Sequence, residues 1–124
     1  MRASEISGGS SSFPTIARIL RTVPEENAFF FYKTIGYYLD VKARNLEEFA
    51  EKLKTIDPAS ISFHLSRWDF GNWLTTTVGD ATLAKLVSTL KDSGNSAADG
   101  EQLRSKIATL VSARLSRLRK LHAT

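Results

Sequence analysis

The last quarter of the sequence has the spacing of one long amphipathic helix, and this pattern constrains the fold most. Seven apolar residues share one helical face there: Leu103, Ile107, Leu110, Val111, Leu115, Leu118 and Leu121. On a helix they form a stripe about 140° wide. A stripe of this width has to be buried against other elements. We therefore predict a helix over about 101–121 that packs on the rest of the chain.

The positive charge of the chain lies in the same segment. Residues 1–100 contain 11 basic and 12 acidic side chains, whereas the whole chain has a net charge of +4. After Glu101, the basic residues are Arg104, Lys106, Arg114, Arg117, Arg119 and Lys120. Three interpretations remain open for these residues: the solvated face of a core helix, a surface that docks a protein partner or a second copy, or a nucleic-acid contact.

Arg114 is the residue that least fits a plain core helix, because it falls inside the apolar stripe, and Arg104 lies near its edge. An arginine there either lays its stem on apolar surface and keeps its head in water, or meets an acidic partner. This misfit is the main reason in the sequence to expect a partner.

Before this helix, the sequence alternates between apolar runs and helix-capping residues. A short helix is predicted after Phe13 and ends before Pro24. The aromatic segment 29–42 predicts one or two short strands, with a helix as the alternative. Asn45 is predicted to cap a helix, with Glu48 in a capping-box position. Asp57-Pro58 favours another helix start, although residues 60–66 alternate as a strand would.

Two further aspartates precede apolar runs and are predicted to cap helices. Asp69 precedes Phe70, and Asp80 precedes a stripe that starts at Leu83, with Gly79 ending the helix between them. Residues 92–100 are predicted to form a polar loop.

The expected fold is mainly α, a small bundle of about five helices with one or two short strands around 29–42. Residues 1–12 are predicted to be a disordered tail, and 13–124 a single domain.

The residue types present exclude several kinds of chemistry. There is no cysteine, and the two histidines, His64 and His122, lack the spacing of zinc ligands. No nucleophile-elbow motif occurs. We expect no catalytic residue, no metal and no cofactor, and no small-molecule substrate can be identified. His64 is interpreted as hydrogen-bonded within a helix junction, with a general base as the lesser alternative. No apolar run is long enough for a membrane span, and we expect a cytoplasmic protein.

Residues around Asp69 have a second interpretation. Asp69 is close in sequence to His64, Arg67 and Trp68, and these four could instead form a recognition loop. The larger aromatic residues are interpreted as core residues: Phe29, Phe31, Tyr37, Trp68 and Trp73. A lesser alternative is an exposed aromatic strand, flanked by Lys33 and Lys42, that stacks on bases.

Several segments together resemble a known family. They are Phe29-Phe30-Phe31-Tyr32, Asn45-Leu46-Glu47-Glu48-Phe49, Phe63-His64-Leu65, Asp69-Phe70-Gly71-Asn72-Trp73 and Gly79-Asp80 followed by Leu83-Ala84. Over roughly 28–90 the chain resembles an uncharacterised small domain found in archaea and bacteria, alone or attached to other proteins. Trp68 departs from this pattern, where a small or polar residue is expected. The resemblance implies an accessory module of archaeal origin and carries over no functional residue.

These observations lead to two expectations of function. The first is a non-catalytic interaction module that docks a protein partner or self-associates. The second is nucleic-acid or ribonucleoprotein binding through the basic last helix.

Overall fold

A computed structural model describes residues 12–90 and 100–123. Its elements are α1 (Ser12–Leu20), η2 (Glu25–Asn27), β1 (Phe29–Thr34), β2 (Tyr37–Ala43), α2 (Leu46–Leu53), α3 (Pro58–Ser66), α4 (Asp69–Asn72), η3 (Trp73–Val78), α5 (Ala81–Ser88) and α6 (Gly100–Ala123). The mainly α prediction is confirmed. The predicted tail, apart from its last residue, and the loop at 92–100, apart from Gly100, lie outside the described residues.

The aromatic segment forms two strands, as predicted, and these pair as an antiparallel hairpin. Tyr32 is opposite Tyr38, and Gly36 has the positive φ of +78° that the tight turn requires. Side chains alternate along β1: Phe29 and Phe31 are buried, whereas Phe30 and Tyr32 are only partly buried. The inner face of the hairpin packs on the helices, and its outer face stays accessible.

The helices after the hairpin begin where their caps predict. Asn45 Oδ1 accepts a hydrogen bond from the backbone N–H of Glu48, and Asp57 Oδ1 accepts one from Ala59. The carboxylate of Glu48 accepts from the backbone N–H of Arg44, one residue before the usual capping-box partner. Segment 58–66 is helical, because the cap and the proline at the first turn outweigh the strand-like alternation.

Helix α4 continues into η3, a wider helical turn. The backbone N–H groups of Gly79 and Asp80 both donate to the carbonyl of Leu74. Gly79 has a φ of +92°, which suits a glycine at a helix C-terminus, as predicted. Asp80 then caps α5 by accepting from the backbone N–H of Leu83.

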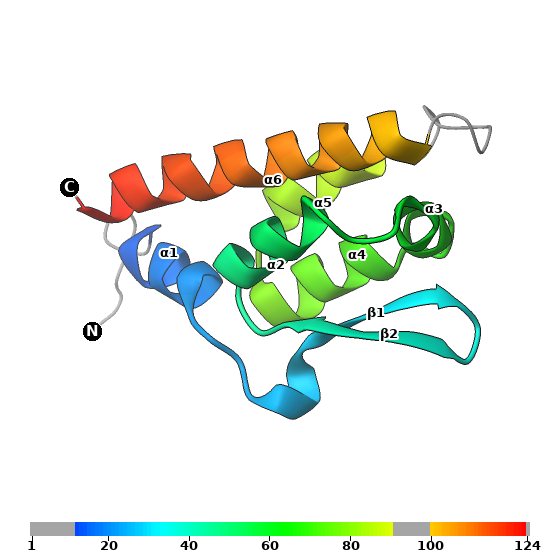
Figure 1. The fold of residues 1–124 in the computed structure, drawn as a ribbon. Helices are drawn as coiled ribbons and strands as arrows, with labels where there is room; N and C mark the ends of the chain where they lie inside the picture. The colour runs from blue at the N-terminus through cyan, green and yellow to red at the C-terminus, as the bar shows by residue number, and fades with distance from the viewer. Residues whose placement is uncertain (1–11, 91–99, 124) are drawn as a thin grey trace.

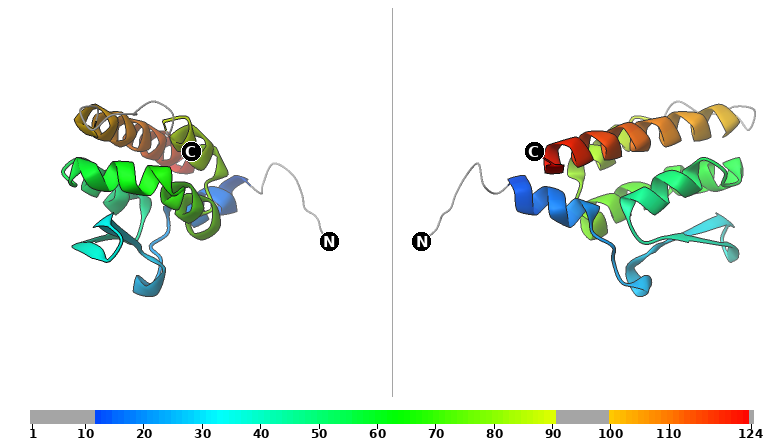
Figure 2. Two further views of the ribbon diagram at one scale, coloured as in Figure 1. Left: turned by 90° about the vertical axis from the view of Figure 1, so that its right-hand side faces the viewer. Right: turned by 60° about the vertical axis from the view of Figure 1, so that its left-hand side comes forward.

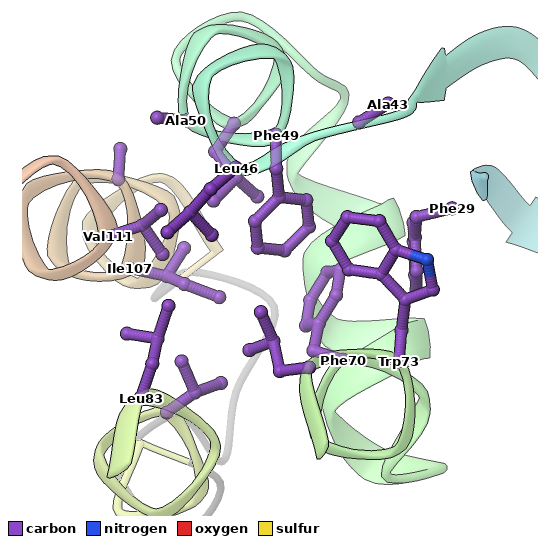
Figure 3. Packing of buried hydrophobic residues seen from close by; sticks show 14 of the residues in the cluster. Phe29, Ala43, Leu46, Phe49, Ala50, Phe70, Trp73, Leu83, Ile107 and Val111 are labelled. Carbon is purple, nitrogen blue, oxygen red and sulfur yellow. The ribbon is translucent and has the colours of Figure 1, made fainter. Parts of the chain in front are cut away.

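Helix α6 runs along one side of the molecule, and the hairpin lies on the opposite side (Figures 1 and 2). Helices α2 and α3 lie between them, since both contact α6 and the hairpin. Ile107 and Val111 of α6 point toward Leu46 of α2 and Leu83 of α5 (Figure 3). The predicted stripe of α6 therefore completes the core of the chain itself.

Candidate functional site

A cleft of about 600 Å³ opens between the hairpin and the helices α3 and α4. It forms there because α3 packs against β1 on one side and α4 on the other. Its lining includes Phe30, Tyr32, Ile35, Phe63, His64, Arg67, Asp69, Asn72 and Trp73. The lining is largely aromatic, with a few polar groups, which is typical of a binding site.

His64 in this cleft is held at both ring nitrogens. The backbone N–H of Tyr32 donates to Nε2 over 2.9 Å, and Nδ1 lies 2.9 Å from Oδ2 of Asp69. Because Nε2 accepts, the neutral ring carries its proton on Nδ1, which donates to the carboxylate. The predicted structural role of His64 thus has a geometric basis: its ring joins α3 to β1.

The same geometry bears on catalysis. A histidine oriented by an aspartate has the arrangement of a general base, but a base needs a free lone pair within reach of the substrate proton. The lone pair on Nε2 of His64 already accepts from Tyr32. Asp69 is the only carboxylate among the described residues that line the cleft. Both ring nitrogens of His64 are thus engaged in hydrogen bonds that link α3 to β1 and to α4.

Burial lowers the pKa of His64 below its ordinary value of 6.5, because desolvation penalises the charged ring. The hydrogen bond and charge of Asp69 act in the opposite direction and are outweighed, while the charge of Arg67 lowers the pKa further. Protonation would also place an N–H of the ring against the N–H of Tyr32. The folded protein therefore holds His64 neutral at pH 7.

This environment predicts a pH-dependent stability. The unfolded chain takes up a proton on His64 below about pH 6.5, whereas the folded chain does so only at lower pH. The contribution of His64 is complete above pH 6.5 and is lost as the pH falls. We expect the free energy of unfolding to decrease as the pH falls below about 6.5, with a slope that stays below about 1.4 kcal/mol per pH unit. Urea unfolding between pH 7.5 and 5 measures it.

The control is the second histidine. His122→Gln should keep the slope, since His122 is exposed near the end of α6, whereas His64→Gln should flatten it. The lowered pKa values of Glu25, which pairs with Lys42, and Asp57, which accepts from Ala59, affect stability only at more acidic pH. An equal slope in His64→Gln and the wild type contradicts the assignment.

Asp69 does not cap its helix, so that prediction was wrong. Trp68 holds the N-cap position without a side-chain cap bond, and Asp69 is the first residue of α4. The carboxylate of Asp69 accepts instead from His64 and from Nε of Arg67, at 3.2 Å. The Arg67 guanidinium also lies over the ring of Phe63, at 5.1 Å from its centroid. His64, Arg67 and Asp69 thus meet in the cleft.

Trp68 does not join them, although the sequence placed it in the same loop. It has a left-handed backbone, with φ of 65°, and is absent from the residues that line the cleft. Its indole lies against Gly71, where any Cβ would collide with the ring. The unexpected tryptophan is therefore accommodated because a glycine follows three residues later.

The hairpin end exposes apolar side chains. Ile35 is 78% exposed and Tyr37 is 55% exposed, and Tyr38 is partly exposed as well. The ring of Tyr38 contacts Tyr32 and Phe30, with centroids 5.4 and 5.8 Å apart. The exposed surface is therefore continuous with the cleft. The interpretation of Tyr37 and Trp68 as core residues was wrong, whereas Phe29, Phe31 and Trp73 are buried as predicted.

Arg114 finds its acidic partner inside the chain. Its Nε and Nη2 donate to the two carboxylate oxygens of Asp80, over 2.9 and 3.0 Å. Asp80 is 1% exposed and also caps α5. The misfit in the stripe is thus explained by a bidentate ion pair that joins α6 to the start of α5.

The other basic residues of α6 divide into two groups. Arg104 donates to the carbonyl of Ile56, after the end of α2, and Arg119 pairs with Glu47. The second group is Lys106, Arg117 and Lys120. These side chains are exposed and make no hydrogen bond or ion pair with another described residue. Half of the basic residues that the sequence singled out therefore make contacts within the chain.

Some cleft residues were missed from the sequence. Phe30 and Tyr32 could have been found, because alternation along a strand puts them opposite the buried Phe29 and Phe31. Asn72 lines the cleft from α4, and no sequence pattern pointed to it.

Within 12–90 and 100–123, no three His, Asp or Glu side chains gather as metal ligands. None of the helices described there has the length and apolar character needed to cross a membrane.

Comparison with known families identifies the chain at the family level. The model of a family of unknown function, DUF5752, matches residues 24–124, so the chain belongs to this family. The predicted resemblance to an uncharacterised domain family is confirmed, and the match extends beyond 28–90 through α6. An archaeal origin stays a prediction. Neither the curated proteins nor the solved structures gave a match.

Proposed function

We propose that this member of the family is a non-catalytic module that docks a protein partner through its hairpin side. The observation that carries the proposal is the exposed apolar surface of Ile35, Tyr37 and Tyr38, which continues into the aromatic cleft through Phe30 and Tyr32. We call these five residues and the cleft the docking face. Clustered exposed apolar residues, aromatics in particular, are characteristic of protein interfaces.

The position of the docking face differs from the sequence expectation, which favoured the last helix. The apolar stripe of α6 is buried, with Ile107 and Val111 fully covered by the body. Of the seven stripe residues, Leu121 is exposed and Leu110 is partly buried, and the two lie about three turns apart. The hairpin side therefore supports docking better than α6 does.

The nucleic-acid alternative receives less support from the same geometry. Lys106 and Lys120 are separated by 14 residues, or about 21 Å along a helix, with Arg117 between them. Affinity for phosphates grows with the number of basic contacts, and three dispersed charges provide few. The lysines that flank the aromatic strand are paired as well, Lys33 with Asp57 and Lys42 with Glu25.

Site-specific photocrosslinking tests the proposal. We expect p-benzoylphenylalanine in place of Tyr38 to give one discrete protein adduct in the cells that make the protein. The matched control is the same amino acid at Leu86, which has similar exposure, 43% against 37%, but lies on α5 away from the hairpin. The mass of the adduct separates another protein from a second copy. Equal labelling at both positions, or none at 38, contradicts the proposal.

A further inference from the structure

We propose that the cleft binds an extended peptide segment that carries a carboxylate side chain. This inference rests on the docking function proposed above and names the class of partner. Three features of the cleft carry it: the open edge of β1, an amide on the facing wall, and a guanidinium with free donors.

The open edge of β1 faces the cleft. The backbone N–H of Tyr32 points toward α3, since it donates to His64, and therefore points away from β2. The pairing with β2 shifts register between Phe30 and Tyr32, but along β1 itself both side chains lie on the accessible face. The backbone N–H and C=O of Phe30 therefore point the same way as those of Tyr32. Phe30 lines the cleft, and no hydrogen bond joins its backbone to a described residue outside the hairpin. An extended chain can satisfy such groups by pairing as a short added strand.

His64 limits how far this strand can extend. Its Nε2 already occupies the N–H of Tyr32, so the available edge is centred on Phe30. The bound segment is therefore short, a few residues at about 3.3 Å each. The same contact keeps the edge from pairing along its whole length with another chain.

Asn72 provides the opposite wall. Its side chain is exposed at the cleft, and its amide has no partner among the described residues; only its backbone carbonyl accepts, from Thr76. A carboxamide donates and accepts at once, which matches a peptide group. A segment between Phe30 and Asn72 would thus find hydrogen bonds on both sides.

The charged residues of the cleft determine which peptide side chain it would bind. Arg67 and Asp69 are the charged residues that line the cleft. The carboxylate of Asp69 already faces two donors, whereas Arg67 is half-exposed and uses only Nε in a hydrogen bond. Its two Nη groups have no partner in the described part of the chain, and such a fork binds a carboxylate well. The ring of Phe63, which is only partly buried and lines the cleft, gives an adjacent apolar residue a surface to contact.

Selection from a phage library of random linear decapeptides tests the inference with the full-length protein. We expect enriched sequences with an acidic residue next to an apolar one. Arg67→Glu should weaken binding of the consensus peptide at least tenfold, and selection on that variant should enrich lysine or arginine instead. Lys106→Glu, on the opposite side of the molecule, is the matched control and should leave affinity unchanged. If Arg67→Glu lowers the melting temperature, Arg67→Gln replaces it in the affinity measurement.

Peptide N-methylation tests the strand geometry directly. Methylating alternate backbone nitrogens of the consensus peptide should abolish binding at one set of positions and spare the other. Peptides that bind without dependence on Arg67, or with no alternation, overturn the inference and leave the docking proposal standing. If no peptide is selected, the inference fails, and crosslinking at position 38 then decides separately whether the docking face binds a folded partner.

Discussion

Arg114→Ala is expected to lower the free energy of unfolding by about 3 kcal/mol. Asp80 is almost completely buried, and both of its oxygens are held by the Arg114 guanidinium. Removing the arginine leaves a buried carboxylate without its counter-charge, which costs far more than the loss of a surface ion pair. The measurement is urea unfolding at pH 7, followed by circular dichroism.

Two variants make this test specific. Arg117→Ala removes an exposed arginine from the same helix and should change stability by less than about 0.5 kcal/mol. Asp80→Ser combined with Arg114→Met removes both charges and keeps a capping oxygen, so the double variant should be more stable than Arg114→Ala. If Arg114→Ala costs no more than Arg117→Ala, the ion pair between Arg114 and Asp80 does not stabilise the fold.

Phe49→Ala is expected to lower the free energy of unfolding by about 3–5 kcal/mol. This is the largest effect that we expect from truncating one side chain. Phe49 is fully buried and contacts the rings of Phe29, Phe31, Phe70 and Trp73, at centroid distances of 5.2 to 6.0 Å. Truncation would leave a cavity among these rings; Figure 3 shows Phe49 facing Phe70 and Trp73. Thermal and urea unfolding measure the loss.

An exposed aromatic residue provides the comparison. Tyr37→Ala should stay within about 0.5 kcal/mol of the wild type, because the ring of Tyr37 is largely in solvent. Domains of this size have only about 5–15 kcal/mol of stability, so Phe49→Ala could abolish folding. In that case Phe49→Leu replaces it, with an expected loss of about 1–2 kcal/mol in the free energy of unfolding. Equal effects at positions 37 and 49 would mean that the assigned burial is wrong.

Local signals predicted the fold well. The caps at Asn45, Asp57 and Asp80 act on backbone groups two or three residues away, so the sequence alone contains both partners. The stripe of α6 likewise follows from helical periodicity, and the strands of 29–42 from their enrichment in aromatic residues. Asp69 shows the limit: its carboxylate was recruited by His64 and Arg67, and a cap motif cannot reveal such competition.

The candidate site depended on contacts that are distant in the sequence. Arg114 was recognised as a misfit, but its partner Asp80 is 34 residues away, and no local pattern joins the two. The cleft likewise requires the edge of β1 to face α4. How these two elements lie relative to each other depends on how the helices pack, which no local pattern shows. Trp68 and Tyr37 were expected in the core because large aromatic residues usually are buried; a left-handed residue and a hairpin turn placed them outside.

The position of α6 in chain order has a consequence for biosynthesis. This helix follows every other described element, yet it contributes Ile107, Val111 and Leu118 to the core and contacts α1, α2, α3 and α5. A nascent chain that has only reached α5 lacks the surface on which these four helices meet. The core can therefore close only after α6 has been synthesised, and until then the apolar residues that α6 covers stay accessible to solvent.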